Sequence, residues 1–260
     1  MNNKTKVLII IQARMSSKRL PGKVLASIGS YRSLDLLIKR VKKSKSTNQY
    51  LVAMPKNSEQ KDLKNFCIKN NITFFEGEED NVLKRFYECA KLYNATHVVR
   101  ITADCPFIDP EIIDDCIEKS VNENYDYVSN TLTQTFPDGL NVAVFTMTAL
   151  EDSYRHAKTK FDKEHVTPFI KRSSKYTKYT FTLNRDKSHV RITIDEKADL
   201  IVANNVLQYF HPNIYFNTKQ ILDMHDECPH LFSANSHLKR NEGSILTDEE
   251  KNKQFLNNTN

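Results

Sequence analysis

The chain contains no tryptophan and only five glycines among its 260 residues. It lacks the G-x-x-x-x-G-K-[ST] loop of P-loop kinases and the G-x-G-x-x-G turn of dinucleotide-binding dehydrogenases, which argues against both classes. A G-x-S-x-G nucleophile elbow is also absent. No apolar run approaches the roughly 20 residues that span a bilayer, and no cleavage-site pattern follows the apolar N-terminal run. We therefore predict a soluble protein with no membrane partner.

Cysteine is sparse and unpaired in the sequence. There is no C-x-x-C pair and no Cys/His spacing of the zinc type. An odd number of thiols without a signal peptide indicates reduced cysteines and a cytoplasmic location. The five residues are Cys67, Cys89, Cys105, Cys116 and Cys228.

The charge balance is mildly basic, with 38 Lys and Arg against 32 Asp and Glu and a formal net charge of +6. This excess suits an anionic substrate. No helix or arm carries a dense basic stripe with interleaved aromatic residues, so a nucleic-acid partner is not expected. The cations between residues 39 and 45 have helical spacing and are interpreted as a solvated helix face.

Strand-like and helix-like segments alternate along the first half of the chain. Strands are expected at residues 7–11, 50–54, 72–75 and 97–101, and helices beginning near residues 33, 58, 80 and 110, with Ser58 and Asp80 as N-caps. The less regular second half predicts strands at 126–129, 141–145, 176–183 and 190–194, and helices at 148–156, 163–172, 197–209 and 218–227. Pro168 is expected either to kink the helix at 163–172 or to begin a new one. Such alternation favours right-handed β-α-β units and a mainly parallel sheet, that is, an α/β fold.

The simplest organisation is one domain over residues 1–232 with an inserted segment near 130–190. Residues 233–260 are polar and rich in Asn, Lys and Glu, and we expect them to form a loosely held tail.

A basic loop directly follows the first apolar run. It extends from Gln12 to Lys23, at the strand end where open α/β sheets bind ligands. Four cations there indicate an anionic ligand, most commonly phosphate, although a solvated surface loop explains them equally well. The cations are Arg14, Lys18, Arg19 and Lys23.

Two carboxylates follow predicted strands at the same sheet edge. Asp104 comes after residues 97–101, and Asp195 comes after residues 190–194. Each could simply cap a turn or a helix. Beside a basic loop, however, the pair favours a site for a nucleoside triphosphate whose Mg²⁺ is held by the carboxylates.

Two further residues have ordinary explanations. From the residues alone, His165 is best interpreted as a hydrogen-bonded structural histidine. Asp138 lies in a Pro-Asp-Gly turn, which accounts for it without a ligand.

The ordered set of motifs resembles one family. The loop has the form Arg14-x-x-Ser17-x-Arg19-Leu20-Pro21-x-Lys23, and the matching segments run in order through the chain. They resemble the CTP-dependent sugar cytidylyltransferases that activate sialic acids and 3-deoxy-manno-octulosonate, and most closely the spore coat polysaccharide biosynthesis protein F branch. These segments are Gln12-Ala13-Arg14-Met15, Leu20-Pro21-Gly22-Lys23-Val24-Leu25, Val99-Arg100-Ile101-Thr102, Asp104-Cys105-Pro106, Ile108-Asp109-Pro110, Phe136-Pro137-Asp138-Gly139-Leu140, Glu164-His165-Val166-Thr167-Pro168 and Arg191-x-Thr193-x-Asp195.

The resemblance implies a three-layer, Rossmann-like nucleotidyltransferase fold, usually in a homodimer. It implies transfer of CMP from CTP to a sugar acid, with release of pyrophosphate, for surface polysaccharide or glycan biosynthesis. Asp104 and Asp195 would hold Mg²⁺, Asp138 and His165 would lie towards the sugar or the dimer contact, and residues 130–190 would form the sugar-side or dimerisation segment. Arg14, Lys23 and Asp104 would be catalytic, and the nucleotide would be bound by Ala13, Arg14, Ser17, Arg19, Lys23, Arg85 and Arg100.

The sequence departs from the family pattern near the expected sugar side, so the departures concern the identity of the acceptor more than the transfer of CMP. Ala103 replaces a usual glycine, Asn141 and Ala143 replace acidic residues, and Lys160 and Lys163 replace arginines. Two rival hypotheses are a nucleotide-sugar-dependent glycosyltransferase and a catalytically inactive nucleotide-binding homologue. The first normally needs an Asp-x-Asp site, which the sequence around Asp104 lacks.

Overall fold

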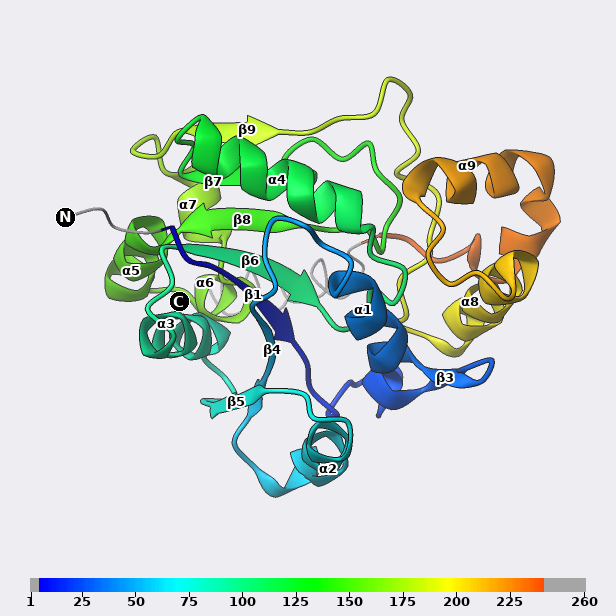
Figure 1. Cartoon of the computed structure of the whole chain (residues 1–260), viewed down its shortest axis with the longest axis horizontal. Coiled ribbons are helices and arrows are strands. Elements are labelled where there is room, and N and C mark those ends of the chain that lie inside the picture. Colours follow the sequence, from blue (N-terminus) through cyan, green and yellow to red (C-terminus); the bar gives the residue numbers. More distant parts are fainter. Residues whose placement is uncertain (1–4, 241–260) are drawn as a thin grey trace, which may run out of the picture.

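A seven-stranded sheet forms the centre of the molecule (Figure 1). The structure, a computed structural model, describes residues 5–240. The strand order is β5-β4-β1-β6-β8-β7-β9. The strands are β1 (Val7–Gln12), β4 (Tyr50–Pro55), β5 (Phe74–Gly77), β6 (His97–Thr102), β7 (Tyr127–Ser129), β8 (Ala143–Thr146) and β9 (Lys178–Thr180).

The sheet is mainly parallel, as predicted. Strands β5, β4, β1 and β6 run parallel to one another, and β9 runs parallel to β7. Strand β8 is antiparallel to both of its neighbours, β6 and β7. Residues Val7–Ile11 of β1 are all buried, because helices cover both faces of the sheet. The strand is therefore apolar throughout and does not alternate between apolar and polar residues.

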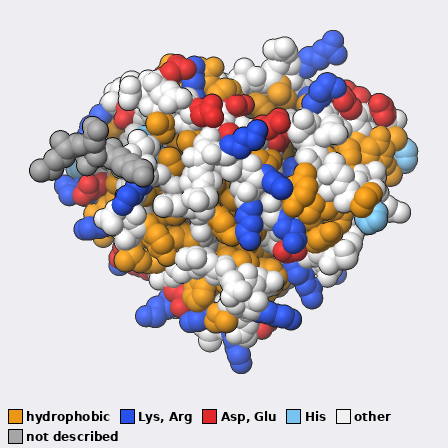
Figure 2. All heavy atoms as spheres, in the orientation of Figure 1, with side chains coloured by type: hydrophobic (Ala, Val, Ile, Leu, Met, Phe, Trp, Pro, Cys, Tyr) orange, Lys and Arg blue, Asp and Glu red, His pale blue; other side chains and the backbone are white. Residues whose placement is uncertain are grey.

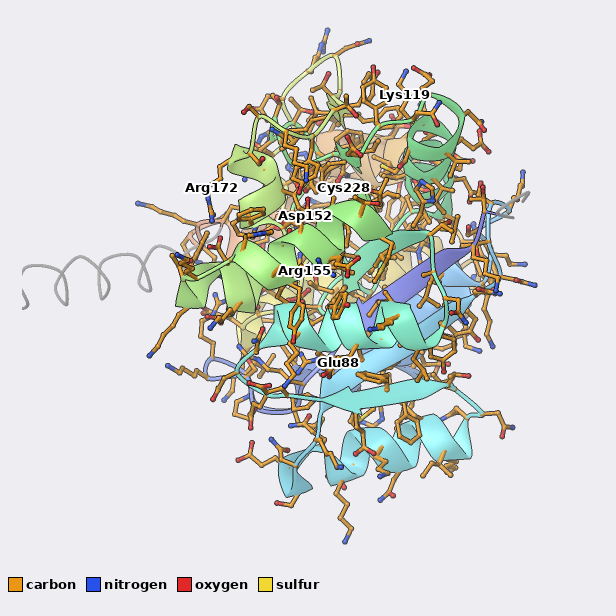
Figure 3. All side chains as sticks on the ribbon, turned by 90° about the vertical axis from the view of Figure 1, so that its left-hand side faces the viewer. Glu88, Lys119, Asp152, Arg155, Arg172 and Cys228 are labelled. Carbon is orange, nitrogen blue, oxygen red and sulfur yellow. The ribbon has the colours of Figure 1, made fainter. Side chains whose placement is uncertain are left out.

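Helices form a layer on each face, so the three-layer α/β architecture is confirmed. On one face, α1 (Ser33–Val41), α2 (Lys61–Lys69), α4 (Pro110–Asn122), α8 (Lys197–Phe210) and α9 (Thr218–Glu227) contribute to one core cluster. A second cluster includes residues of α3 (Val82–Leu92), α5 (Met147–His156) and α7 (Pro168–Arg172), beside which lies α6 (Lys160–His165). Figure 3 shows α3 and α5 side by side, with Glu88 on the first and Asp152 and Arg155 on the second.

Several predicted boundaries move by one or two residues. Asn81, not Asp80, caps α3, because its side chain accepts from the backbone N–H of Lys84 at 3.0 Å. Ser58 lies inside a short 3-10 helix, η2 (Ser58–Gln60), and is not an N-cap. The helical segment expected at 163–172 is two helices, and Pro168 begins the second, which confirms one of the two alternatives for this proline.

The prediction of a strand at residues 190–194 is wrong. The segment is extended but forms only an isolated bridge between Asp138 and Arg191. Its backbone N–H groups donate instead to two loops: that of Ile192 to Asp138 O and that of Ile194 to Asp104 O, both at 2.8 Å. The alternating pattern therefore reflects packing between loops, and it brings Asp195 next to Asp104.

The C-terminal segment is better packed than its composition suggests. Pro229–Asn235 forms the 3-10 helix η3, in which Phe232 and Asn235 are buried. The expectation of a loosely held tail from Ser233 is therefore wrong for residues 233–240, while residues 241–260 lie outside the described part. The division of the chain at residue 232 stays a prediction, as does the role assigned to residues 130–190, although β8 from that segment lies within the sheet.

The prediction for Arg40 is also wrong. It was expected on a solvated helix face, but its side chain is fully buried. Its guanidinium donates to the carbonyl oxygens of Ile108, Ile214 and Phe216 at 2.6–2.7 Å. Arg40 thus connects α1 to the β6–α4 loop and to the segment before α9, a role that helical spacing does not reveal.

The outer surface carries mixed charges. On the face seen in Figure 2, Lys and Arg side chains lie at several separate places among acidic and apolar ones. Among residues 5–240, no helix is both long enough and apolar enough to cross a bilayer.

Candidate active site

The ammonium group of Lys23 lies between two carboxylates. Lys23 begins the 3-10 helix η1 (Lys23–Leu25), and the preceding Gly22 has φ 73°, a left-handed conformation that glycine adopts without strain. Lys23 Nζ donates to Asp104 Oδ2 at 2.8 Å and to Asp195 Oδ1 at 2.6 Å. The structure therefore brings together three predicted site residues from three distant parts of the sequence.

The environment of Asp104 keeps its carboxylate ionised. Burial opposes ionisation, but the charge and hydrogen bond of Lys23 lower the pKa of Asp104 to about 2. The Cys105 thiol lies 3.5 Å from Asp104 Oδ1. In return, and against the effect of burial, the two carboxylates raise the pKa of Lys23. Asp104 is thus negatively charged at neutral pH and available to a cation.

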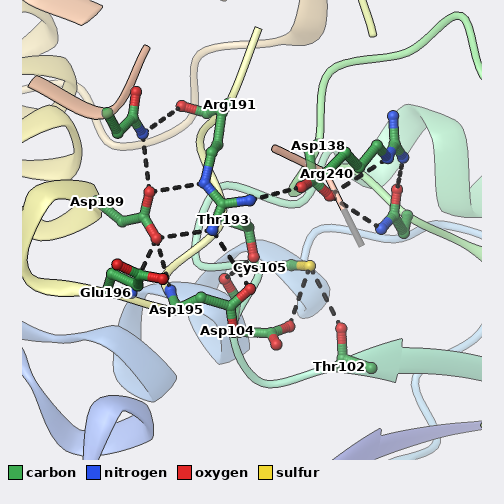
Figure 4. A network of polar contacts seen from close by, with 12 residues as sticks. Thr102, Asp104, Cys105, Asp138, Arg191, Thr193, Asp195, Glu196, Asp199 and Arg240 are labelled. Carbon is green, nitrogen blue, oxygen red and sulfur yellow. Dashed lines mark hydrogen bonds and ion pairs between the residues drawn. The ribbon is translucent and has the colours of Figure 1, made fainter. Parts of the chain in front are cut away.

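Asp195 is held by a network at the start of α8 (Figure 4). The side chain of Asp199, which is buried, accepts from the backbone N–H groups of Asp195 and Glu196 at 2.8 and 2.9 Å. Glu196 is the N-cap of α8, so the helix-capping explanation for Asp195 is wrong. The side chain of Asp195 contacts Lys23 instead. Arg19 completes the arrangement with an ion pair to Asp195 at 3.1 Å.

Asp138 lies two ion pairs beyond Asp195, with Arg191 between them. Arg191 joins it to the site, because its guanidinium contacts Asp138 at 3.0 Å, Asp199 at 2.8 Å and Asp195 at 3.4 Å. Burial raises the pKa of Asp138, and Arg240 and Arg191 oppose that shift. Figure 4 shows Arg240 on the far side of Asp138 from Arg191.

Arg14 and Arg85 form a separate basic pair. Arg14 is exposed, and Arg85 is only 1% exposed. Burial, and then the charge of Arg14, lower the pKa of Arg85 to about 10, so it remains charged at neutral pH. Arg85 donates to the carbonyl oxygen of Glu78 at 2.8 Å, which stabilises the turn between β5 and α3. Nucleotide contact by either arginine stays a prediction.

The remaining residues of the predicted nucleotide site occupy different positions. Ala13 is buried just after β1, where its N–H donates to Ala53 O at 3.1 Å. Ser17 Oγ accepts from Leu20 N at 3.4 Å and so shapes the basic loop itself. Arg100 donates to Gln12 Oε1 at 3.0 Å. His165 ends α6 with its ring 4.4 Å from that of Phe161, and its expected role towards the sugar or the dimer contact stays a prediction.

The carboxylate pair fits a magnesium ion that is shared with a substrate. Among residues 5–240, no group of three or more His, Cys, Asp or Glu side chains is arranged to hold a metal by itself. Magnesium is commonly bound by one or two carboxylates plus phosphate oxygens and water, and two carboxylates around one ammonium provide that donor set.

Three residues of the network were missed as site residues: Arg191, Asp199 and Arg240. The sequence did contain a signal for Asp199. It lies at the third position of the helix that follows Asp195, and a carboxylate there can accept from the free N–H groups at the helix start. Arg191 was recognised only as part of a motif. Nothing local in the sequence connects Arg240 with Asp138, because that contact depends on the course of the C-terminal segment.

Comparison with known sequences places this arrangement in one family. The model of the family described as cytidylyltransferase matches residues 8–243. An uncharacterized protein of Methanocaldococcus jannaschii is 35% identical, over 90% of this chain and 96% of its own length. The spore coat polysaccharide biosynthesis protein SpsF of Bacillus subtilis is 33% identical, over 74% of this chain and 82% of its own length.

Solved structures agree with the sequence matches. A cytidylyltransferase from Leptospira borgpetersenii has a TM-score of 0.83 at 28% identity, covering 88% of this chain and 97% of that one. A CMP:2-keto-3-deoxy-manno-octonic acid synthetase complexed with CTP shares the fold, with a TM-score of 0.59 at 13% identity over 79% of this chain and 99% of that one. The resemblance seen in the motifs is therefore confirmed, and the chain belongs to the cytidylyltransferase family.

Proposed function

We propose that this chain transfers CMP from CTP to a sugar acid, with Mg²⁺ as cofactor and pyrophosphate as the second product. The observation that carries the proposal is Lys23 between Asp104 and Asp195. A cation and two carboxylates at the end of β1 and β6 suit a triphosphate and its metal ion. The match to SpsF supports a role in polysaccharide biosynthesis, and the thiols support a cytoplasmic location.

The reaction forms one bond and breaks one. An acceptor oxygen attacks the α-phosphorus of CTP and loses its proton, while the bond between the α-phosphorus and the α–β bridging oxygen breaks and pyrophosphate leaves. An ammonium group has three N–H donors, and Lys23 uses two on the carboxylates, which leaves the third for a phosphate oxygen. Arg14 and Arg19 add positive charge from the basic loop. Mg²⁺ held by Asp104 and Asp195 would supply further positive charge for the phosphates.

Substitutions at the carboxylate pair test this proposal. We expect Lys23→Ala and Asp104→Asn each to reduce pyrophosphate release from CTP by at least about 100-fold. The first removes a cation that would face the phosphates, and the second removes a carboxylate that would hold Mg²⁺. Circular dichroism and thermal unfolding check that both variants fold. Lys69→Ala and Asp62→Asn remove the same charges from exposed positions on α2 and should keep wild-type turnover. Normal turnover by folded Lys23→Ala and Asp104→Asn would refute the assignment.

A homodimer also belongs to this proposal. Leu92 at the end of α3 is 65% exposed, and the neighbouring Tyr93 and Tyr154 are each 36% exposed. Tyr154 on α5 stacks on Tyr87 of α3, with the ring centroids 4.4 Å apart, so exposed apolar and aromatic side chains lie on two adjacent helices. Exposed apolar groups of this kind are typical of a protein–protein contact.

A further inference from the structure

The basic loop closes on the backbone of one residue, Met15. The carbonyl oxygen of Met15 accepts from the N–H groups of Ser17 and Gly22, both at 2.9 Å, so the loop folds back on this point. Arg14 directly precedes Met15, and Lys23 directly follows Gly22. The position of Met15 therefore determines where the side chains of both of these cations start.

A buried side chain from another loop holds Met15. Gln60, the last residue of η2, is 1% exposed, and its Oε1 accepts from the Met15 N–H at 2.8 Å. Its Nε2 donates to Asn57 Oδ1 at 3.2 Å. Asn57 in turn donates to Glu79 Oε2 at 2.6 Å, in the turn between β5 and α3. These hydrogen bonds connect the basic loop to the loops that follow β4 and β5.

The local helix does not account for the burial of Gln60. Glutamine is mostly found at the surface, because burying an amide is unfavourable unless it is hydrogen-bonded. Gln60 also stands at the N-cap of α2, but in the described part of the chain its side chain makes no capping bond to that helix. Its amide oxygen bonds instead to a residue 45 positions away in the sequence. The contact with Met15 is therefore the feature that its burial secures.

We propose that Gln60 is a positioning residue for the triphosphate site. It fixes Met15, and through Met15 it holds Arg14 and Lys23 ready for the phosphates. This inference rests on the proposed function. A loop that is ordered before the ligand arrives loses little conformational entropy on binding, whereas a mobile loop must be ordered at the expense of affinity.

Binding measurements on Gln60→Leu test the role. Leucine fills a similar volume but leaves the Met15 N–H without an acceptor. Calorimetry would compare CTP, CMP and inorganic triphosphate as ligands. We expect affinity to fall at least about 10-fold for CTP and for inorganic triphosphate, but less than about 3-fold for CMP, which offers the loop cations a single phosphate.

Thr47→Val is the matched control. Thr47 Oγ1 donates to the carbonyl oxygen of Val7 at 2.8 Å, so this variant also removes a hydrogen bond between a side chain and the backbone of a distant segment. The bond lies at the start of β1, the end of the strand away from the basic loop. Affinities for all three ligands should stay within about 2-fold of the wild type.

Trypsin cleavage reports directly on the order of the loop. Arg14, Lys18 and Arg19 are exposed, and trypsin cuts after each of these residue types. We expect cleavage at these sites, identified by mass spectrometry, to be at least about 5-fold faster in Gln60→Leu than in the wild type or Thr47→Val. Gln60→Glu keeps an oxygen acceptor for the Met15 N–H and should restore resistance.

A second variant covers the case in which Gln60→Leu does not fold. Asn57→Ala removes the acceptor of the Gln60 amide from a less buried position. It should give the same pattern at a smaller size, about 3-fold for CTP and for inorganic triphosphate and less for CMP.

The outcomes separate this inference from the proposed function. Unchanged triphosphate affinity in folded Gln60→Leu, unchanged trypsin cleavage, or an equal loss for all three ligands would overturn the positioning role, while CTP binding by the wild type would leave the proposed function standing. A wild type that binds inorganic triphosphate in a Gln60-dependent way but does not prefer CTP would support the positioning role and refute the proposed function. Binding of neither CTP nor inorganic triphosphate would overturn both.

Discussion

At the scale of single residues, Asp199 organises the site without facing the substrate. Its carboxylate accepts from Arg191, from Asn235, and from two backbone N–H groups at the start of α8. Burial raises its pKa, but these bonds, Arg191 first, lower it overall. An ionised, fully bonded carboxylate of this kind fixes the positions of Asp195 and Arg191 relative to Lys23.

We expect Asp199→Asn to destabilise the fold by about 3 kcal/mol, because it leaves a buried arginine half paired. Since the folded pKa of Asp199 lies below its unfolded value, its contribution is present above about pH 4 and lost as pH falls below that. Urea unfolding at pH 7 and at pH 3.5 should show a smaller difference between variant and wild type at the lower pH. Asp223→Asn removes an exposed ion pair and should cost under about 0.5 kcal/mol. A stability loss in Asp199→Asn that did not change with pH would contradict the role given to its charge.

Local sequence signals identified residues but not their partners. Lys23, Asp104 and Asp195 could be found because each follows a strand-like run. The proximity of Lys23 and Asp104 follows from the pairing of β1 with β6, whereas Asp195 is brought to them by the bond of Ile194 N–H to Asp104 O. Arg40 and Arg240 could not be placed, since nothing near an arginine in the sequence shows which distant carbonyl or carboxylate it contacts. Polar groups buried by tertiary structure are therefore the part of the site that sequence patterns miss.

At the scale of elements, the close approach of two loops shapes the site. Gly139 has φ 113°, and a Cβ there would lie 2.6 Å from the backbone N of Thr193. Only glycine permits this contact, through which the backbone of Asp138 bonds to that of Val190 and Ile192. The Pro-Asp-Gly turn signal was correct, but its packing against residues 190–194 was not predictable from the turn.

Gly139→Ala should therefore destabilise the protein by more than about 3 kcal/mol and reduce turnover, because backbone cannot move aside as a side chain can. Gly29→Ala is the matched control. Gly29 also has positive φ, at 55°, but its added Cβ would meet only the flexible Leu207 side chain, at 2.9 Å. We expect it to cost about 1–2 kcal/mol with full activity. Thermal unfolding and pyrophosphate release measure both effects, and similar losses in the two variants would rule out a special role for the loop contact.

The regular elements were the easiest part of the fold to predict. Helix α9 and the first strands came from periodicity, because long apolar faces must be buried whatever the partner. Residues 190–194 have the same alternation but lie between two loops, and 178–180 is a short edge strand where 176–183 was expected. A local pattern records which side is buried but not whether a neighbouring strand is available for pairing.

At the scale of the whole molecule, the face formed by α3 and α5 makes the proposed dimer testable (Figure 3). Light scattering should give a mass twice the 30.2 kDa of the chain. Leu92→Glu combined with Tyr154→Glu replaces exposed apolar groups on α3 and α5 with charges and should produce monomers. Ile68→Glu alters an exposed apolar residue on α2, at the other face of the sheet, and should remain dimeric. A wild-type protein that is monomeric at micromolar concentration would contradict the dimer.

The proposed role of the carboxylate pair and Lys23 is to bind CTP and its metal ion. It is tested most directly by measuring pyrophosphate release from each of the four nucleoside triphosphates, with Mg²⁺ and a panel of sugar acids. We expect release that requires both CTP and one of the acids, and that stops when the metal is removed with a chelator. No release from CTP with any acid, or equal release from all four nucleotides, would contradict it.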